Sequence, residues 1–134
     1  MLIEPTRDFE IIRMWPRAMF QKKENGRLLI KQFVRQLELP GVYMLYRGDN
    51  LYYIGKATKD LFGRLHSHAN KSTDTYYAHW DHFSAFAFTG TPGTSKAKLT
   101  EIEAILIAAM PTSKNRSTPR FKAVRIPKQL LKAR

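Results

Sequence analysis

The sequence predicts a small α+β domain in which helices pack on a short, mainly antiparallel sheet. Three observations support this fold class. Two β-prone runs flank a short turn sequence, a third run alternates small and aromatic residues, and apolar residues recur elsewhere at helical spacing. The 134 residues, 43% of them hydrophobic, suit one compact domain, because a domain usually takes about 100 to 200 residues.

The N-terminal segment, residues 1–38, is predicted to be a helical extension. Apolar residues within 11–16 suggest a short helix with a break at Pro16. Apolar residues then recur at helical spacing over 28–37, and Pro40 closes this second helix because proline cannot continue one.

The centre of the chain is predicted to form a β-hairpin followed by a helix. Residues 41–46 and 51–56 are β-prone runs, and the Arg-Gly-Asp-Asn sequence at 47–50 is typical of a turn. Asp60 is a suitable N-cap for a helix that runs to about Ala69, because its side chain can accept a hydrogen bond from a free N–H of the first turn.

A third strand and a third helix complete the predicted core. Residues 83–89 alternate small and aromatic side chains, as a strand with two different faces does. After a loop at 91–93, either Thr94 or Ser95 can cap a helix over about 96–110.

Basic residues outnumber acidic ones, most clearly at the C-terminal end. Lys and Arg number 23 against 11 Asp and Glu, and the net charge of +12 indicates a polyanionic partner such as nucleic acid. Residues 114–134 hold eight basic and no acidic side chains. The part from 117 to 134 is predicted to be a basic tail that could follow a phosphate backbone, although a solvated tail explains the same composition.

Several classes of protein are disfavoured by what the sequence lacks. The chain has no cysteine, which excludes thiolate metal sites and cysteine nucleophiles. The most apolar stretch, residues 102–110, is far shorter than the roughly 20 residues that a bilayer needs. No export signal is visible, so we expect a cytoplasmic location and no membrane partner.

The second and third helices carry three candidates for chemistry. Arg64 and His68 lie four residues apart and share one helix face, although a solvated face would show the same pair. Glu103 falls within the apolar stripe of the third helix, where an isolated charge would be unfavourable by several kcal/mol. Its expected partner is a metal ion or Arg64, and a purely structural salt bridge is the alternative.

The hairpin and the loops add further candidates. Tyr43 and Tyr53 lie in the two strands, where core packing is the usual fate of a tyrosine. Lys56 ends the second strand beside Gly55, whose missing side chain would let a backbone or a phosphate approach closely. The four histidines match no zinc spacing, which disfavours a zinc site.

In their order along the chain, these residues resemble the GIY-YIG nuclease family. That family includes homing endonucleases, some restriction enzymes and the N-terminal domain of the UvrC repair subunit. The two triplets that name it occur here as Gly41-Val42-Tyr43 and Tyr53-Ile54-Gly55. The further residues that follow in the family's order are Lys56, Arg64, His68, Glu103, Pro111 and Asn115. The resemblance covers about residues 39–116, which are therefore predicted to be the nuclease core.

The resemblance implies a three-stranded antiparallel sheet flanked by helices. It also implies a metal-dependent endonuclease that hydrolyses phosphodiester bonds of DNA, with a role such as repair or recombination. Glu103 would be the sole protein ligand of one Mg²⁺ or Mn²⁺ ion per active site. Arg64 would hold the scissile phosphate. Tyr43 or Tyr53 would act as the general base, with His68 accepting or relaying the proton. Substrate contacts are implied for Gly55, Lys56, Asn115 and Arg116.

Two other functions fit the same residues. A non-catalytic module of this fold would bind nucleic acid through its basic residues without turnover. A nuclease that cleaves RNA would use the same phosphate and metal contacts. DNA, or another nucleic acid, is the expected partner in each case.

Overall fold

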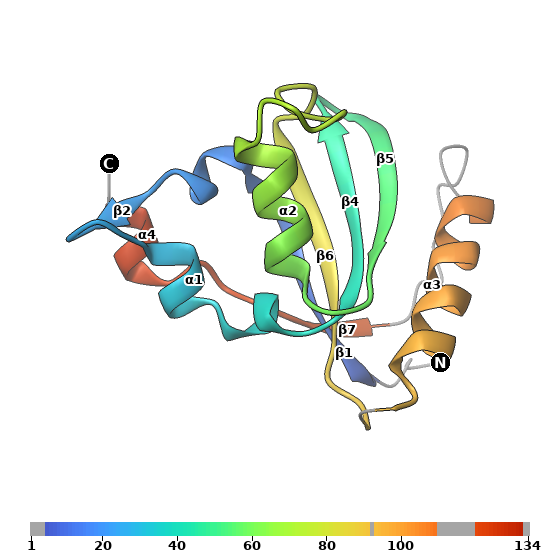
Figure 1. Ribbon diagram of the computed structural model, residues 1–134. Helices are drawn as coiled ribbons and strands as arrows, with labels where there is room; N and C mark the ends of the chain where they lie inside the picture. Colours follow the sequence, from blue (N-terminus) through green and yellow to red (C-terminus); the bar gives the residue numbers. More distant parts are fainter. Residues whose placement is uncertain (1–4, 92, 110–119, 133–134) are drawn as a thin grey trace.

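The computed structural model describes residues 5–91, 93–109 and 120–132 (Figure 1). In these residues the strands are β1 (Pro5–Pro16), β2 (Lys23–Glu24), β3 (Arg27–Leu28), β4 (Gly41–Arg47), β5 (Asn50–Ala57), β6 (His82–Phe88) and β7 (Arg120–Ala123). The helices are α1 (Leu29–Phe33), α2 (Leu61–Asn70), α3 (Ser95–Ala109) and α4 (Lys128–Lys132), with two short 3₁₀ helices, η1 (Arg17–Phe20) and η2 (Arg35–Glu38). None of the described helices is long and apolar enough to span a membrane.

Five strands form the main sheet, in the order β5-β4-β6-β1-β7. The first four pair antiparallel, whereas β7 runs parallel to β1. The predicted α+β class with an antiparallel sheet and flanking helices is confirmed. The expected number of three strands is wrong, because segments before and after the hairpin region add β1 and β7 beside β6.

The sheet separates two apolar clusters, one under each of the longer helices (Figure 1). On the α2 face of the sheet, Tyr43 and Phe83 pack in one cluster with Leu61 of α2. On the opposite α3 face, Val42 packs in a second cluster with Leu99 of α3. Successive side chains of a strand point to opposite faces, so neighbouring residues of β4 pack against different helices.

The central elements lie close to their predicted positions. β4 and β5 form the expected hairpin, with Gly48 at a φ of 61° in its turn. Asp60 caps α2, because its carboxylate accepts a hydrogen bond of 2.6 Å from the Gly63 N–H. The strand β6 and the helix α3 are also found where the alternating and apolar patterns predicted them.

β1 occupies the segment for which a helix was predicted over residues 11–16. The strand pairs with β6, and its register shifts between Ile12 and Trp15. Within this bulge Met14 has a φ of 50°, and its N–H donates to Ser84 Oγ at 2.9 Å. The extra residue of the bulge brings Ile12 and Trp15 into the same cluster. The resulting apolar spacing imitates that of a helix, which explains the wrong prediction.

The helix predicted over residues 28–37 is present only in part. α1 ends at Phe33, and Val34, with φ −115° and ψ 86°, separates it from η2. Val34 and Leu37 are nevertheless buried in the α2-face cluster. The apolar positions were therefore identified correctly, but the β-branched Val34 leaves the helical conformation.

Beyond residue 119 the C-terminal segment belongs to the packed domain. Val124 N–H donates to the Ile11 carbonyl at 2.6 Å where β7 lies beside β1. In α4, which contacts α1, Leu130 is fully buried. Residues 120–132 thus pair and pack with the rest of the domain. The predicted segment boundaries and any phosphate contact stay predictions. The stretches 117–119 and 133–134 lie outside the described residues.

Candidate active site

Both motif tyrosines lie on the α2 face of the hairpin. Tyr43 pairs with Gly55 across the two strands, and the ring centroids of Tyr43 and Tyr53 are 6.1 Å apart. A Cβ at Gly55 would clash with the ring and hydroxyl of Tyr43 and would lie 2.7 Å from the Tyr53 ring. The space above Gly55 is therefore taken by the Tyr43 phenol, where the sequence suggested a backbone or a phosphate.

A chain of hydrogen bonds connects Tyr43, His68 and Asp74. The Tyr43 hydroxyl lies 2.8 Å from His68 Nε2, and His68 Nδ1 lies 2.8 Å from Asp74 Oδ1. Desolvation works against the ionised form of Asp74, but the hydrogen bonds from His68 and from the Tyr76 N–H lower the pKa of this carboxyl. An ionised Asp74 can only accept, so His68 Nδ1 carries the proton, and Nε2 is left to accept from the Tyr43 hydroxyl.

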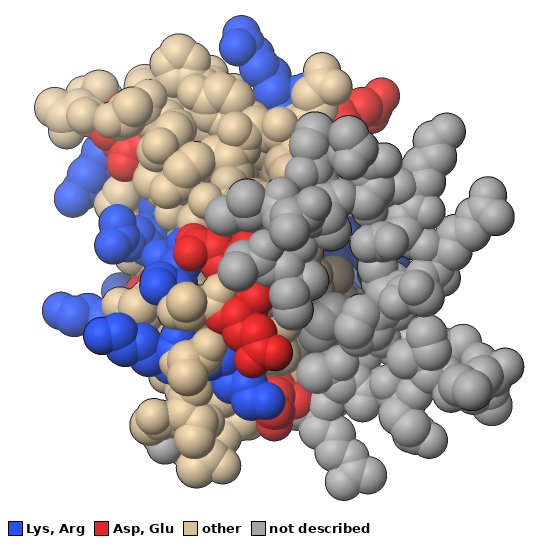
Figure 2. Space-filling view, turned by 90° about the vertical axis from the view of Figure 1, so that its right-hand side faces the viewer, with Lys and Arg blue, Asp and Glu red and all other residues tan. Residues whose placement is uncertain are grey.

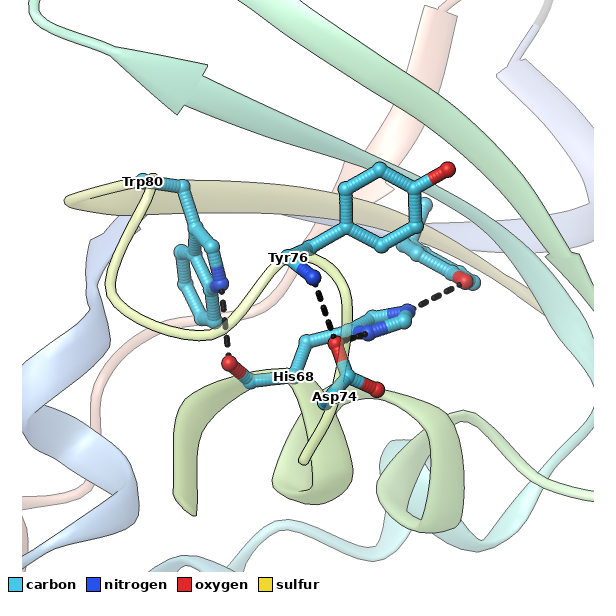
Figure 3. A network of polar contacts seen from close by, with 5 residues as sticks. His68, Asp74, Tyr76 and Trp80 are labelled. Atoms are coloured by element: carbon cyan, nitrogen blue, oxygen red, sulfur yellow. Dashed lines mark hydrogen bonds and ion pairs between the residues drawn. The ribbon is translucent and has the colours of Figure 1, made fainter. Parts of the chain in front are cut away.

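The loop between α2 and β6 holds this chain in place (Figure 3). The Tyr76 N–H donates to Asp74 Oδ1 at 2.8 Å, and the indole N–H of Trp80 donates to the His68 carbonyl at 3.2 Å. The His68 and Tyr76 ring centroids are 5.2 Å apart, and the Tyr76 ring stacks on Tyr53 at 4.2 Å. Two hydrogen bonds and neighbouring tyrosine rings thus fix the orientation of the imidazole.

The Tyr43 phenol is neutral in this environment. The residue is only 1% exposed, and this burial raises the pKa of Tyr43 well above the ordinary value. The neighbouring Tyr53 acts in the same direction, whereas the positive charge of Arg64 lowers the pKa of Tyr43. Tyr43 can therefore act as a base only if its own proton moves to His68 or if more positive charge comes close.

Arg64 lies on the exposed side of α2, one turn before His68, as the spacing predicted. It borders a cavity of about 390 Å³ that is also lined by His68, Lys71 and Asp74. It borders a second cavity, of about 290 Å³, at the start of α2 beside Lys59. Within the described parts of the chain, no carboxylate forms an ion pair with Arg64. Its guanidinium is available to an anion from solvent.

Glu103 lies on α3, on the other face of the sheet from Arg64. It is half-buried rather than buried as the apolar stripe predicted, and no ion pair with Arg64 is found among the described residues. Lys56 Nζ donates to Thr100 Oγ1 at 3.2 Å, which ties α3 to the edge strand β5 one turn before Glu103. Acidic and basic side chains lie next to one another on this side of the molecule (Figure 2).

Comparison with known protein families identifies the chain. Its sequence matches the GIY-YIG catalytic domain over residues 39–115, more than half of its length. The chain belongs to the GIY-YIG family. It therefore carries a nuclease-type catalytic domain whose substrate class is nucleic acid. No curated protein and no solved structure matches it significantly.

GIY-YIG nucleases generally depend on a divalent metal ion, and the side chains present fit such an ion at Glu103. The described residues contain no group of three or more His, Asp or Glu that could hold a metal by themselves. Glu103 is half-buried and forms no ion pair with any residue that the structure describes, and its carboxylate is a hard oxygen donor. It suits Mg²⁺, which usually keeps several waters and takes other ligands from substrate phosphates. Asn115 and Arg116 lie outside the described residues, so their substrate contacts stay predictions.

The sequence did not identify Asp74 and Tyr76 as part of the site. Both lie in the loop between α2 and β6, where no periodic spacing relates a side chain to its neighbours. One signal was present in the GIY-YIG domain: Asp74 is the single acidic residue within 61–80, six positions after His68. A lone carboxylate near a histidine is a suitable partner for its ring N–H.

Proposed function

We propose that this GIY-YIG chain is a metal-dependent endonuclease that hydrolyses phosphodiester bonds of DNA. The observation that carries the proposal is the chain of hydrogen bonds through Tyr43, His68 and Asp74 beside the exposed Arg64. It combines a proton acceptor with a phosphate-binding cation in a domain of nuclease type. The net charge of +12 favours a polyanionic substrate.

Tyr43 and His68 act together as the general base in this proposal. As the attacking water bonds to phosphorus, its proton passes to the Tyr43 oxygen while the Tyr43 proton passes to His68 Nε2. Asp74 keeps the other ring proton on Nδ1 and stabilises the imidazolium that forms, as the carboxylate of a Ser-His-Asp triad does. The P–O3′ bond breaks, and the 3′ oxygen takes a proton from solvent.

Tyr43 is preferred to Tyr53 because it alone of the two is hydrogen-bonded to His68 within the described residues. Tyr53 contacts the His68 ring edge to face at 6.1 Å and is partly exposed. We assign Tyr53 to the wall along which the attacking water approaches.

Arg64 binds the scissile phosphate. Its planar guanidinium presents paired donors to two phosphate oxygens, which suits the charge that grows on them during the reaction. The same positive charge lowers the pKa of Tyr43 and so eases the departure of the phenol proton.

Glu103 is the proposed protein ligand of one Mg²⁺ or Mn²⁺ ion. α3 contacts β5 through the Lys56–Thr100 hydrogen bond, and the His68 ring of α2 contacts β5 from the other face. The substrate would therefore meet Arg64 and Glu103 across this edge strand. When bound, such an ion would supply positive charge that stabilises the reacting phosphate and the leaving group. Of the further expected substrate contacts, Lys56, Asn115 and Arg116 stay proposals, whereas the Tyr43 phenol fills the space above Gly55.

Cleavage of plasmid and branched DNA with Mg²⁺ or Mn²⁺ tests this function. The wild-type protein should cut, and Glu103→Ala should lower the rate by about 100-fold or more, since loss of each 1.4 kcal/mol of transition-state stabilisation is tenfold in rate. Glu101→Ala is the matched control, because Glu101 is an exposed carboxylate of the same helix. Absence of cleavage on every DNA, or cleavage that is unchanged in Glu103→Ala, would contradict the proposal.

The same assay separates the other two functions. Salt-dependent DNA binding without metal-dependent cleavage would identify a non-catalytic binding module. Faster cleavage of an RNA oligomer than of the DNA of the same sequence would identify RNA as the substrate.

A further inference from the structure

A wide cavity of the described residues lies away from the Tyr43–His68 pair. It has a volume of about 790 Å³ and lies between the β2–β3 hairpin, α1 and α2, the elements at the left and centre of Figure 1. Its lining includes three cationic side chains, Lys23, Arg27 and Lys31, and four polar ones, Gln21, Gln32, His66 and Asn70. The N-terminal segment therefore builds a second basic hollow against the helix that carries Arg64.

The positive charge around this cavity has little acidic compensation. From η1 through α1, residues 17–33, the chain has five basic side chains and one acidic side chain, Glu24. In the described parts of the chain, no carboxylate forms an ion pair with Lys23, Arg27 or Lys31. These three exposed cations are therefore available to an anionic ligand.

His66 lies in the cavity wall and is affected by the same cations. Its ring stacks on Phe62 with centroids 5.0 Å apart. Burial lowers the pKa of His66, and the charges of Lys31, Lys71 and Lys23 lower it further. Beside it Gln21 Nε2 donates to Asn70 Oδ1 at 2.5 Å, which gives the cavity a polar wall. The cavity thus combines positive potential with hydrogen-bonding groups, as a phosphate site does.

α2 connects this cavity to the proposed catalytic site. His66 and Asn70 face the basic cavity, whereas Arg64 and His68 line the smaller cavity near Asp74. Lys71 bridges the two, because it lines the smaller cavity and its charge acts on His66. The resulting row of cations across α2, here called the cation track, consists of Lys23, Arg27, Lys31, Lys71 and Arg64.

We propose that the cation track binds consecutive backbone phosphates of the cleaved DNA strand and that the basic cavity holds those on one side of the scissile bond. The proposal deepens the proposed function and rests on it in taking DNA as the substrate and Arg64 as the residue at the scissile phosphate. A helix is about 10 Å across, and the phosphates of one strand advance about 3.4 Å per nucleotide along a duplex. A strand anchored at Arg64 would thus reach the cavity after roughly three nucleotides.

Two triple variants with the same change in charge test the proposal. The first is Lys23→Gln with Arg27→Gln and Lys31→Gln. The control, at exposed residues outside the cation track, is Arg13→Gln with Arg47→Gln and Lys98→Gln. DNA affinity is measured against salt concentration without divalent ions, so that cleavage does not contribute.

Each lost phosphate contact should reduce the slope of log affinity against log salt by about 0.9. We expect a reduction of about 2 to 3 for the cavity variant and less than about 1 for the control. Equal reductions in the two variants, or an unchanged slope in the cavity variant, would overturn the proposal.

The His66 ring provides a readout that does not depend on total charge. Phosphates bound in the cavity offset the lysine charges, so saturation with DNA should raise the pKa of His66 in an NMR titration. An unchanged His66 pKa would overturn the proposal. An equal rise of the His66 pKa with inorganic phosphate would also overturn it, because the cavity would then bind single anions and not a DNA strand. Neither measurement needs cleavage: a protein that binds DNA here without cutting it would contradict the proposed function and leave the binding of a DNA strand by the cation track standing.

Discussion

Burial and hydrogen bonding act on the Tyr43 side chain in opposite directions. Burial keeps the phenol neutral, because the charged form would lose its hydration. The contact with His68 Nε2 gives its proton a place to go. A tyrosine with a high pKa is thus a competent base only as part of a pair, and the pair depends on the protonation of the histidine ring.

Replacing Tyr43 by Phe should lower the single-turnover rate of DNA cleavage by about 10²- to 10⁴-fold, the usual contribution of general acid–base catalysis. Tyr53→Phe should have a smaller effect, and Tyr52→Phe, at an exposed tyrosine of the same strand, should have none. Tyr43→Phe also leaves His68 Nε2 without its hydrogen-bond partner, which should lower the free energy of unfolding by about 1–3 kcal/mol. Unfolding of each variant is therefore measured in parallel. A larger loss in Tyr53→Phe than in Tyr43→Phe would reverse the assignment.

Asp74 links the site to the pH dependence of stability. Its hydrogen bonds lower the pKa of its carboxyl in the folded protein, so the unfolded chain takes up the proton first as pH falls. The stabilisation is therefore complete above the ordinary Asp pKa of about 3.9 and is lost as pH falls through the folded value. The difference in free energy of unfolding between wild type and Asp74→Asn should be largest near neutral pH and shrink below about pH 4. Urea unfolding across pH measures it, and a difference independent of pH would refute the role of the ionised carboxylate.

The sequence alone was enough to predict the site residues whose positions are fixed by a motif or by helical spacing. Arg64 and His68 share a face of α2 because a four-residue spacing gives them no other arrangement. No motif or regular spacing predicts the contact between His68 and Asp74. It depends on the path of the loop, which is set by contacts such as that of Trp80 with the His68 carbonyl. Glu103 was located by its helical spacing, but its half-exposure follows from how α3 meets β5, which no local pattern encodes.

At the level of elements, local pattern predicted the hairpin, α2, β6 and α3, because their turns, caps and periodicities lie within a few residues. It failed for β1, where a bulge at Met14 gives a strand the apolar spacing of a helix. It also failed for β7, whose pairing with β1 joins residues more than a hundred positions apart. Long-range pairing decides such segments, and a single sequence does not display it.

α4 allows a direct test that the C-terminal segment is part of the domain. Leu130 is fully buried beside α1, and the next residue, Leu131, is 63% exposed. Leu130→Ala should lower the free energy of unfolding by about 2–5 kcal/mol, because it removes a packed side chain and leaves a cavity. Leu131→Ala is the matched control and should change it by less than about 0.5 kcal/mol. Equal small effects in thermal and urea unfolding would restore the interpretation of this segment as a solvated tail.

In the whole molecule, the sheet keeps the two halves of the proposed chemistry apart. The proton-transfer residues and Arg64 are on the α2 face, and Glu103 comes from α3 on the other. The edge strand β5 is therefore the place where a phosphate could meet both groups. The cation track leads away from this edge over α2, so a bound strand would run along the N-terminal segment.

This arrangement also predicts how a plasmid is cut. The matched catalytic domain occurs once in the chain, so under the proposed function one binding event would hydrolyse one strand. Breaking both strands then needs a second event or a second copy of the chain. With plasmid in excess over protein, nicked circles should accumulate before linear DNA, and the linear form should rise only as nicked circles decline. Gel electrophoresis over time measures the three forms, with Glu103→Ala as the control that should leave the plasmid supercoiled. Linear DNA formed from the first time points without a nicked intermediate would show instead that two chains act together on one site.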